Sequence, residues 1–248
     1  MIAFAIPPDL AGVARLAGEV ALAAAFMPGL RIFPSAGGGS PPASVTFTAN
    51  ASSNTTSLGY NFTSQNFGAE SADRYILVGV AGQGASAAAV SSVTIGGVSA
   101  TQLFSASSST ATVAFWIAAV PSGTSGTIFI QWAAQRSRCA AVVWALTGLQ
   151  SATAIDTGSA ANSGSGALSD TIDVSAGGVA VAMAYDTGTG SRTWTWTGLT
   201  EVVDTTFASG RSYTGASANF TAGQSGLTVQ AAPSGSTTAN VLGIVSLR

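Results

Sequence analysis

Short runs of β-branched and aromatic residues alternate with Gly/Ser clusters from Val45 to the end of the chain. Strands separated by turns produce this pattern in β-sandwiches and barrels. Residues 75–81 are apolar almost without interruption, which predicts a strand buried on both faces. Residues 93–98 place two glycines between apolar residues and predict a tight hairpin, because glycine accepts positive φ angles. Further strands are expected at 112–120, 127–132 and 139–146, and no useful helix after residue 45.

The second half of this region repeats the order of the first at offsets of 100 to 103 residues. Residues 76–80, 93–98, 123–126 and 141–144 correspond to residues 179–183, 194–199, 223–226 and 241–244. Low-complexity sequence can produce such similarity by chance, but the preserved order favours an internal duplication, with pseudo-repeats at about 70–149 and 175–248. No Pro/Gly-rich linker lies between 149 and 155. We therefore expect an all-β fold with one two-sheet, jelly-roll-like sandwich over residues 45–248.

The first 36 residues follow a different pattern. Asp9 can cap a helix that runs through Ala, Leu and Val residues to Met27, where Pro28 and Gly29 end it. We predict a helical anchor segment that docks on a partner protein, followed by a Gly/Pro linker over residues 37–44. The expected docking residues are Leu10, Val13, Arg15, Leu16, Val20 and Phe26.

Three other interpretations of this segment stay open. A signal peptide requires a basic region before its apolar stretch, and nothing basic precedes Arg15. A membrane anchor requires about 20 apolar residues, and Arg15 and Glu19 interrupt the run. A helix that packs against the sheets is the third.

Charge is scarce along the whole chain. Only 7% of the residues are charged, against about 25% in an average soluble domain. All eight basic residues are arginines, and there is neither lysine nor histidine. A surface of hydroxyls and amides is typical of secreted proteins, fibres and packed assemblies. A net charge of −2 without a basic stripe argues against nucleic-acid binding.

The missing residue types exclude most catalytic chemistry. Without histidine there is no Ser-His-Asp triad, and without lysine no P-loop lysine or Schiff base. One cysteine without histidine makes a zinc or iron site implausible, so we expect no metal and no cofactor. Cys139 lies in an apolar run and is expected to be a buried thiol without a disulfide partner.

Carboxylate chemistry is the remaining route to an enzyme, because two acids can hydrolyse a glycoside. Asp156, Asp170 and Asp173 are close in sequence, but Asp170 and Asp173 should lie on opposite faces of a strand. No loop has the spacing of a calcium site. We expect these acids to cap turns, with glycosidase activity as the less favoured alternative.

Aromatic residues give the better binding signal. Trp194 and Trp196 face one side of a strand, and Phe207, Arg211 and Tyr213 follow in a Gly-rich stretch. Aromatic rings beside hydroxyls and an arginine suit a sugar or a receptor surface, which makes Trp194, Trp196, Arg211 and Tyr213 the candidate ligand-binding residues. The alternative is that the two tryptophans line the sandwich core. Core positions are expected for Trp116, Trp132 and Trp144.

Several stretches resemble a broad group of phage and bacterial structural β-sandwich proteins, over roughly residues 70–190. They are residues 74–80, 93–98, 113–121 and 140–148, and Ile155-Asp156. Members of that group lie on phage tails and capsids or in cell-surface proteins, so the resemblance implies display and attachment and transfers no catalytic residue.

These observations predict a non-enzymatic structural protein of a tailed-bacteriophage virion. Its partners would be capsid, neck or tail proteins bound through residues 1–36, with a host-surface glycan or receptor and a homo-oligomer as further options. A secreted or cell-surface carbohydrate-binding β-sandwich module is the second hypothesis. A bacterial surface protein whose N-terminus inserts into a membrane is the third.

Overall fold

The computed structural model describes residues 41–248 except 165, 208–209 and 236–237, and these residues form strands and turns without a helix. Every strand pairing among them is antiparallel, so the all-β expectation is confirmed. The expected helix, its docking residues Leu10, Val13, Arg15, Leu16, Val20 and Phe26, and linker residues 37–40 lie outside the described residues.

The first half, Ser44–Thr147, contains nine strands in two sheets. The first inner sheet has the order β1-β9-β3-β7-β6, and the first outer sheet has the order β2-β8-β4-β5. The strands are β1 (Ser44–Ser53), β2 (Ser57–Asn66), β3 (Tyr75–Gln83), β4 (Val90–Ile95), β5 (Val98–Ser99), β6 (Thr101–Ser107), β7 (Ala111–Ala119), β8 (Ser125–Arg136) and β9 (Arg138–Thr147).

The second half, Asp156–Leu247, contains eight strands in two further sheets. The second inner sheet has the order β10-β17-β12-β15-β14, and the second outer sheet has the order β11-β16-β13. The strands are β10 (Asp156–Asn162), β11 (Leu168–Val174), β12 (Val179–Asp186), β13 (Trp194–Thr197), β14 (Thr200–Thr206), β15 (Ser212–Asn219), β16 (Gln224–Pro233) and β17 (Asn240–Leu247).

The two halves share one strand order. In the inner sheets, the order β1-β9-β3-β7-β6 of the first half corresponds to the order β10-β17-β12-β15-β14 of the second. In the outer sheets, β2-β8-β4 corresponds to β11-β16-β13. The repeat seen in sequence therefore has a counterpart in topology. It is longer than the predicted pseudo-repeats at 70–149 and 175–248, because the first two strands of each half belong to it.

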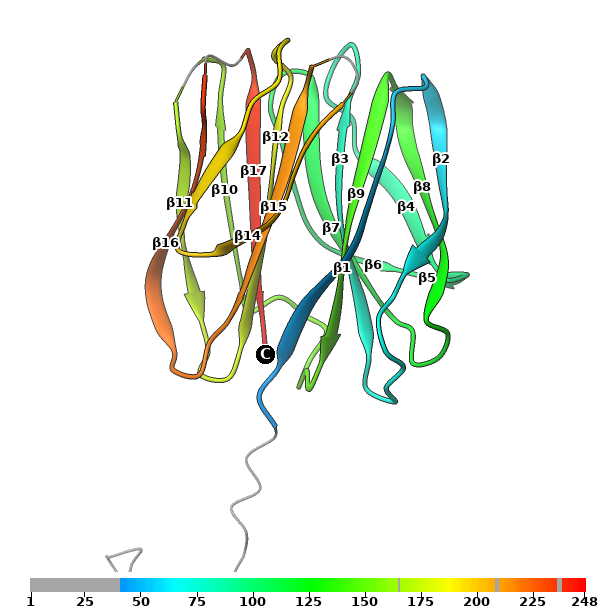
Figure 1. Ribbon diagram of the computed structural model, residues 1–248, viewed down its shortest axis with the longest axis vertical. Helices are drawn as coiled ribbons and strands as arrows, with labels where there is room; N and C mark the ends of the chain where they lie inside the picture. The colour runs from blue at the N-terminus through cyan, green and yellow to red at the C-terminus, as the bar shows by residue number, and fades with distance from the viewer. Residues whose placement is uncertain (1–40, 165, 208–209, 236–237) are drawn as a thin grey trace, which may run out of the picture. The chain divides into compact units, whose positions relative to one another are not determined.

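Four sheets stack in the order outer, inner, inner, outer, with one apolar core in each gap (Figure 1). The central core contains residues of both halves, including Phe115, Trp144 and Met183. The two flanking cores each contain residues of one half only. The expected single two-sheet sandwich is therefore wrong in its number of sheets.

The burial of the inner strands explains that difference. Along β9, alternate side chains point to opposite sides: Val142 and Trp144 into the central core, Ala141 and Val143 into the first flanking core. A strand that is apolar on both faces requires cover on both sides, whereas each sheet of a simple sandwich leaves one face to water. The strand predicted at 75–81 is buried on both faces, as expected.

The hairpin expected at residues 93–98 is present. Ile95 of β4 pairs with Val98 of β5, and the two residues between them are Gly96 at φ 60° and Gly97 at φ 82°. Positive φ at both central residues is the requirement of a type I′ turn, which glycine meets without a steric cost.

The inner sheets interlock because large residues of one half face glycines of the other. Cβ atoms added at Gly243 of β17 would lie 3.2 Å from Phe104 and 3.3 Å from Phe115, both in the first half. Added at Gly215 of β15, a Cβ would lie 3.1 Å from Trp144. In the reverse direction, the sulfur of Met183 lies over Gly79, 3.1 Å from the Cβ position.

The contacting positions are equivalent in the two repeats. Tyr75 pairs with Ala119 and Leu146, and Val179 pairs with Asn219 and Leu247, which aligns the registers of the inner sheets. In that alignment Gly79 matches Met183, Phe115 matches Gly215 and Val142 matches Gly243. The halves thus have complementary shapes at three neighbouring positions.

The described chain begins and ends at the same end of the sandwich, the lower end in Figure 1. Arg248 Nη1 donates to the Pro41 carbonyl at 2.9 Å, and Ala43 N donates to Gly177 O at 2.8 Å. The opposite end, called the distal end below, carries the loops 84–89 and 187–193 that follow β3 and β12.

We expect Gly243→Val to lower the free energy of unfolding by about 1–3 kcal/mol, because its added carbons would overlap Phe104, Val113 and Phe115 in a close-packed core. Chemical denaturation measures the loss. Gly164→Val is the matched control, since a Cβ there meets nothing within 4 Å. Equal stabilities of the two variants would contradict this packing.

Candidate functional site

Carboxylates of the described residues mostly hold main-chain N–H groups. Asp156 accepts from Thr157 N and Asp173 N, both at 2.8 Å. Asp170 accepts from Thr171 N at 2.8 Å and from Ser159 N at 2.7 Å. Each of these carboxylates thus uses both oxygens on backbone donors, which is the structural role expected of them.

Two further acids have matching roles in the two halves. Glu70 precedes β3 and accepts from Gly123 N at 2.6 Å, and Asp173 precedes β12 and accepts from Gly226 N at 2.7 Å. In each half the donor belongs to the start of the long outer strand or to the turn before it. Such charge-assisted bonds fix loops rather than activate a substrate.

Neither a metal-ligand cluster nor a membrane-spanning helix is found within the part of the chain that the structure describes. There, no three His, Cys, Asp or Glu side chains gather closely enough to hold a metal ion. In the same residues no helix is long and apolar enough to cross a membrane.

Trp194 and Trp196 lie together on one face of β13, as the sequence predicts. Trp194 is 5% exposed, and its Nε1 donates to Ser212 Oγ at 3.0 Å. Trp196 is partly exposed, and its Nε1 donates to Thr214 Oγ1 at 2.8 Å. Both rings pack in the second flanking core, which agrees with the core alternative for Trp194.

Tyr213 and Arg211 do not join these tryptophans. Tyr213 alternates with Ser212 and Thr214 along β15, so it points to the other face of that strand, where it is 1% exposed in the central core. Its hydroxyl accepts from Asn50 Nδ2 at 3.1 Å. Arg211 precedes β15 at the distal end, close to the charges of Arg138 and Asp186. The four residues therefore form no common aromatic binding surface.

The other aromatic and thiol predictions hold. Trp116, Trp132 and Trp144 are 7%, 1% and 0% exposed. Cys139 is fully buried and free of a disulfide, and burial raises the pKa of its thiol to about 12.

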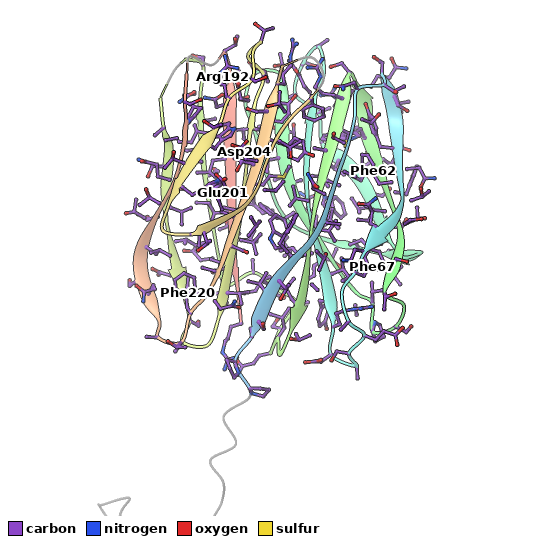
Figure 2. All side chains as sticks on the ribbon, viewed as in Figure 1. Phe62, Phe67, Arg192, Glu201, Asp204 and Phe220 are labelled. Carbon is purple, nitrogen blue, oxygen red and sulfur yellow. The ribbon has the colours of Figure 1, made fainter. Side chains whose placement is uncertain are left out.

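A polar pocket that the sequence did not reveal lies at the distal end of the second half. It has a volume of about 260 Å³ and is lined by Ser191, Arg192, Thr193, Asp204, Thr206 and Ser234. Figure 2 shows Arg192, Asp204 and Glu201 following one another down the side of the second half where β14 runs. Burial raises the pKa of Asp204 against the opposing effect of its bond from Trp194 N.

Glu201 contributes a second carboxylate beside this pocket. It is exposed, and its pKa is raised by partial burial and then by the nearby charge of Asp204. The sequence offered only one sign of this pocket, the two acids Glu201 and Asp204 in a short Thr- and Val-rich run. Their side chains lie on the same face of β14 because of a bulge between Glu201 and Val203.

Comparison with known proteins identifies no related protein. The chain matches no protein-family model, and neither the curated proteins nor the solved structures contain a significant match.

Removing single loop-holding carboxylates should destabilise the fold. Asp173→Ala and Glu70→Ala each leave a glycine N–H without its acceptor, so each should cost about 1 kcal/mol, measured by urea denaturation. Thr197→Ala, at an exposed position, serves as control and should change little. An unchanged midpoint for both acid variants would refute the role of these bonds.

The raised pKa of Asp204 predicts a pH-dependent effect of Asp204→Asn. An acid whose pKa is higher in the folded than in the unfolded state favours folding least once pH exceeds the folded pKa. Relative to wild type, the variant should therefore gain stability as pH rises from about 4 to 7. Thermal unfolding at a series of pH values measures the difference. A difference that does not vary with pH would contradict the buried charge.

Proposed function

We propose that the chain is a non-enzymatic structural protein of a tailed-bacteriophage virion. In this proposal residues 1–36 dock to a capsid, neck or tail protein and the sandwich is displayed for attachment or decoration. The observation that carries the proposal is that the two ends of the body differ. The chain enters beside its own C-terminus at one end, through the contacts of Pro41 and Ala43, and the loops 84–89 and 187–193 lie at the other.

The strand order supports a jelly-roll classification for each half. Counted along the first half, β1, β9, β3 and β7 lie in one sheet and β2, β8, β4 and β5 in the other. Two intertwined Greek keys produce this order, and jelly rolls are recurrent in viral capsids and lectins. The second half has the same order without a counterpart of β5, so we infer that one jelly roll was duplicated.

The use of charge also supports a structural role. Arg74 is 1% exposed, and its guanidinium donates to main-chain carbonyls, among them Val120 O at 2.7 Å and Gly123 O at 2.6 Å. Arg74 and the acids that hold loops are a large part of the few charged residues in the chain, and all of them bind backbone groups of the fold itself. The surface is left to Ser, Thr, Asn and Gly, which suits a protein packed into or displayed on a particle.

A secreted or cell-surface carbohydrate-binding module is the second candidate. The aromatic residues first proposed for it do not converge. What favours it is the hydroxyl-lined pocket beside Asp204, together with the occurrence of jelly rolls among lectins.

Deleting residues 1–40 should leave a folded body that no longer enters particles. Particles purified on a density gradient from cells that produce the full chain or the deletion variant would be compared by mass spectrometry, and circular dichroism would check the fold. Val20→Asp in the full chain should lower incorporation, because a charge on the docking face costs burial energy.

Gly164→Val in the full chain is the control and should be incorporated normally. Normal incorporation of the deletion variant would refute the anchor, and absence of the full chain from all particles would refute the virion assignment.

A further inference from the structure

The pocket at the distal end of the second half is held in shape by its own backbone. Thr193 N donates to Ser234 Oγ at 3.1 Å, and Ser234 N donates back to Thr193 O at 2.8 Å. Trp194 N donates to Asp204 Oδ2 at 2.9 Å, which ties β13 to β14 beside the pocket. The walls are therefore fixed before any ligand arrives, which reduces the entropy cost of binding.

Arg192 lines the pocket, and its positive charge is neutralised by an ion pair with Asp186. Its Nη1 lies 2.8 Å from Asp186 Oδ2 and donates to Gly190 O at 2.9 Å, while Nη2 donates to Thr189 O at 3.1 Å. The ion pair is largely buried, with side-chain exposures of 11% and 0%. An arginine committed in this way does not offer a net positive charge to an anion.

Asp204 is the unsatisfied member of the pocket. Its Oδ2 accepts from Trp194 N, but its Oδ1 is buried and has no hydrogen-bond partner among the described residues. An unpaired buried carboxylate oxygen loses its hydration without a replacement hydrogen bond, so such an atom calls for an explanation. The oxygen needs a donor that the fold does not supply.

The first half serves as an internal control, because the same strands are built there without this carboxylate. Thr206 of β14 pairs with Ser212, and Ser107 of β6 pairs with Thr112, at equivalent ends of the two hairpins. In this register Asp204 opposite Thr214 replaces Ser105 opposite Ala114.

The first half therefore builds the same strands without an acid at this place. Local departures from what a fold needs are expected at functional sites.

We propose that this pocket binds a neutral carbohydrate, with a sugar hydroxyl donating to Asp204 Oδ1. The hydroxyls of Ser191, Thr193, Thr206 and Ser234 line the pocket and can both donate and accept, which matches the vicinal hydroxyls of a pyranose. Trp196, partly exposed and two residues beyond Trp194 on β13, provides an aromatic edge for a longer glycan.

Charge selects against the other ligand classes. Asp204 and Glu201 would repel a phosphate, sulfate or uronate. A metal cation would find too few ligands, because no three His, Cys, Asp or Glu side chains of the described residues gather closely enough to hold one. A neutral polyol remains, and a volume of about 260 Å³ accommodates one sugar ring.

The inference deepens the proposed display function by giving the distal end a ligand class, yet it does not depend on which particle or cell carries the protein. Isothermal titration of the purified full chain with glucose, galactose, mannose, rhamnose and N-acetylglucosamine tests it, up to about 50 mM sugar. At least one of these sugars should bind.

Two variants assign that binding to the pocket. Asp204→Asn should weaken it at least about tenfold, because its amide can still accept from Trp194 N but presents a donor where Oδ1 accepted. Thr206→Val removes one lining hydroxyl with little change of shape and should weaken it several-fold. Asp170→Asn is the matched control, since Asp170 holds two backbone N–H groups away from the pocket, and it should bind as wild type does.

Absence of binding to all five sugars would overturn the proposal, as would undiminished binding by a folded Asp204→Asn variant. Binding of glucuronate or Ca²⁺ in place of neutral sugars would also overturn it. Failure here leaves particle incorporation unaffected, and loss of incorporation on deletion of residues 1–40 leaves sugar binding unaffected, so the two proposals fail separately.

Discussion

The body depends on the contact between its two inner sheets. Each repeat has an inner sheet that is apolar on both faces, so neither could stand alone in water without exposing a large hydrophobic surface. Complementary shapes remove this exposure: Phe115 packs against Gly243, Trp144 against Gly215, and Met183 against Gly79. Identical repeats would place large residue against large residue, or glycine against glycine, at these places. The asymmetry between repeats is thus a condition of the fold.

Both faces of each inner sheet are covered by apolar side chains, so charged residues act mainly at the ends of the strands. Buried Arg74 and the carboxylates before β3 and β12 bind backbone groups at the ends of strands, where the ladder hydrogen bonds stop. Asp204 is different, because one of its oxygens faces a pocket without a partner. The fold does not explain this unsatisfied carboxylate oxygen, whereas recognition of a sugar hydroxyl would.

Sequence pattern predicted the strands well and the layers less well. The hairpin around Gly96 and Gly97 and the core positions of Trp132 and Trp144 followed from local rules of turn chemistry and apolar periodicity. The number of sheets did not, although one strand had been recognised as apolar on both faces. The pocket was missed because Arg192 and Asp204 line it together only through the pairing of strands, and Glu201 shares a face with Asp204 only through a bulge, neither of which local spacing encodes.

Differential scanning calorimetry of the full chain tests the interlocked core most directly. Two sandwiches that merely touch would unfold independently, whereas halves that share the central core should unfold together. The account predicts one heat-absorption peak for the body, with equal calorimetric and van't Hoff enthalpies. Two resolved transitions, each with the enthalpy expected of about half the body, would contradict it.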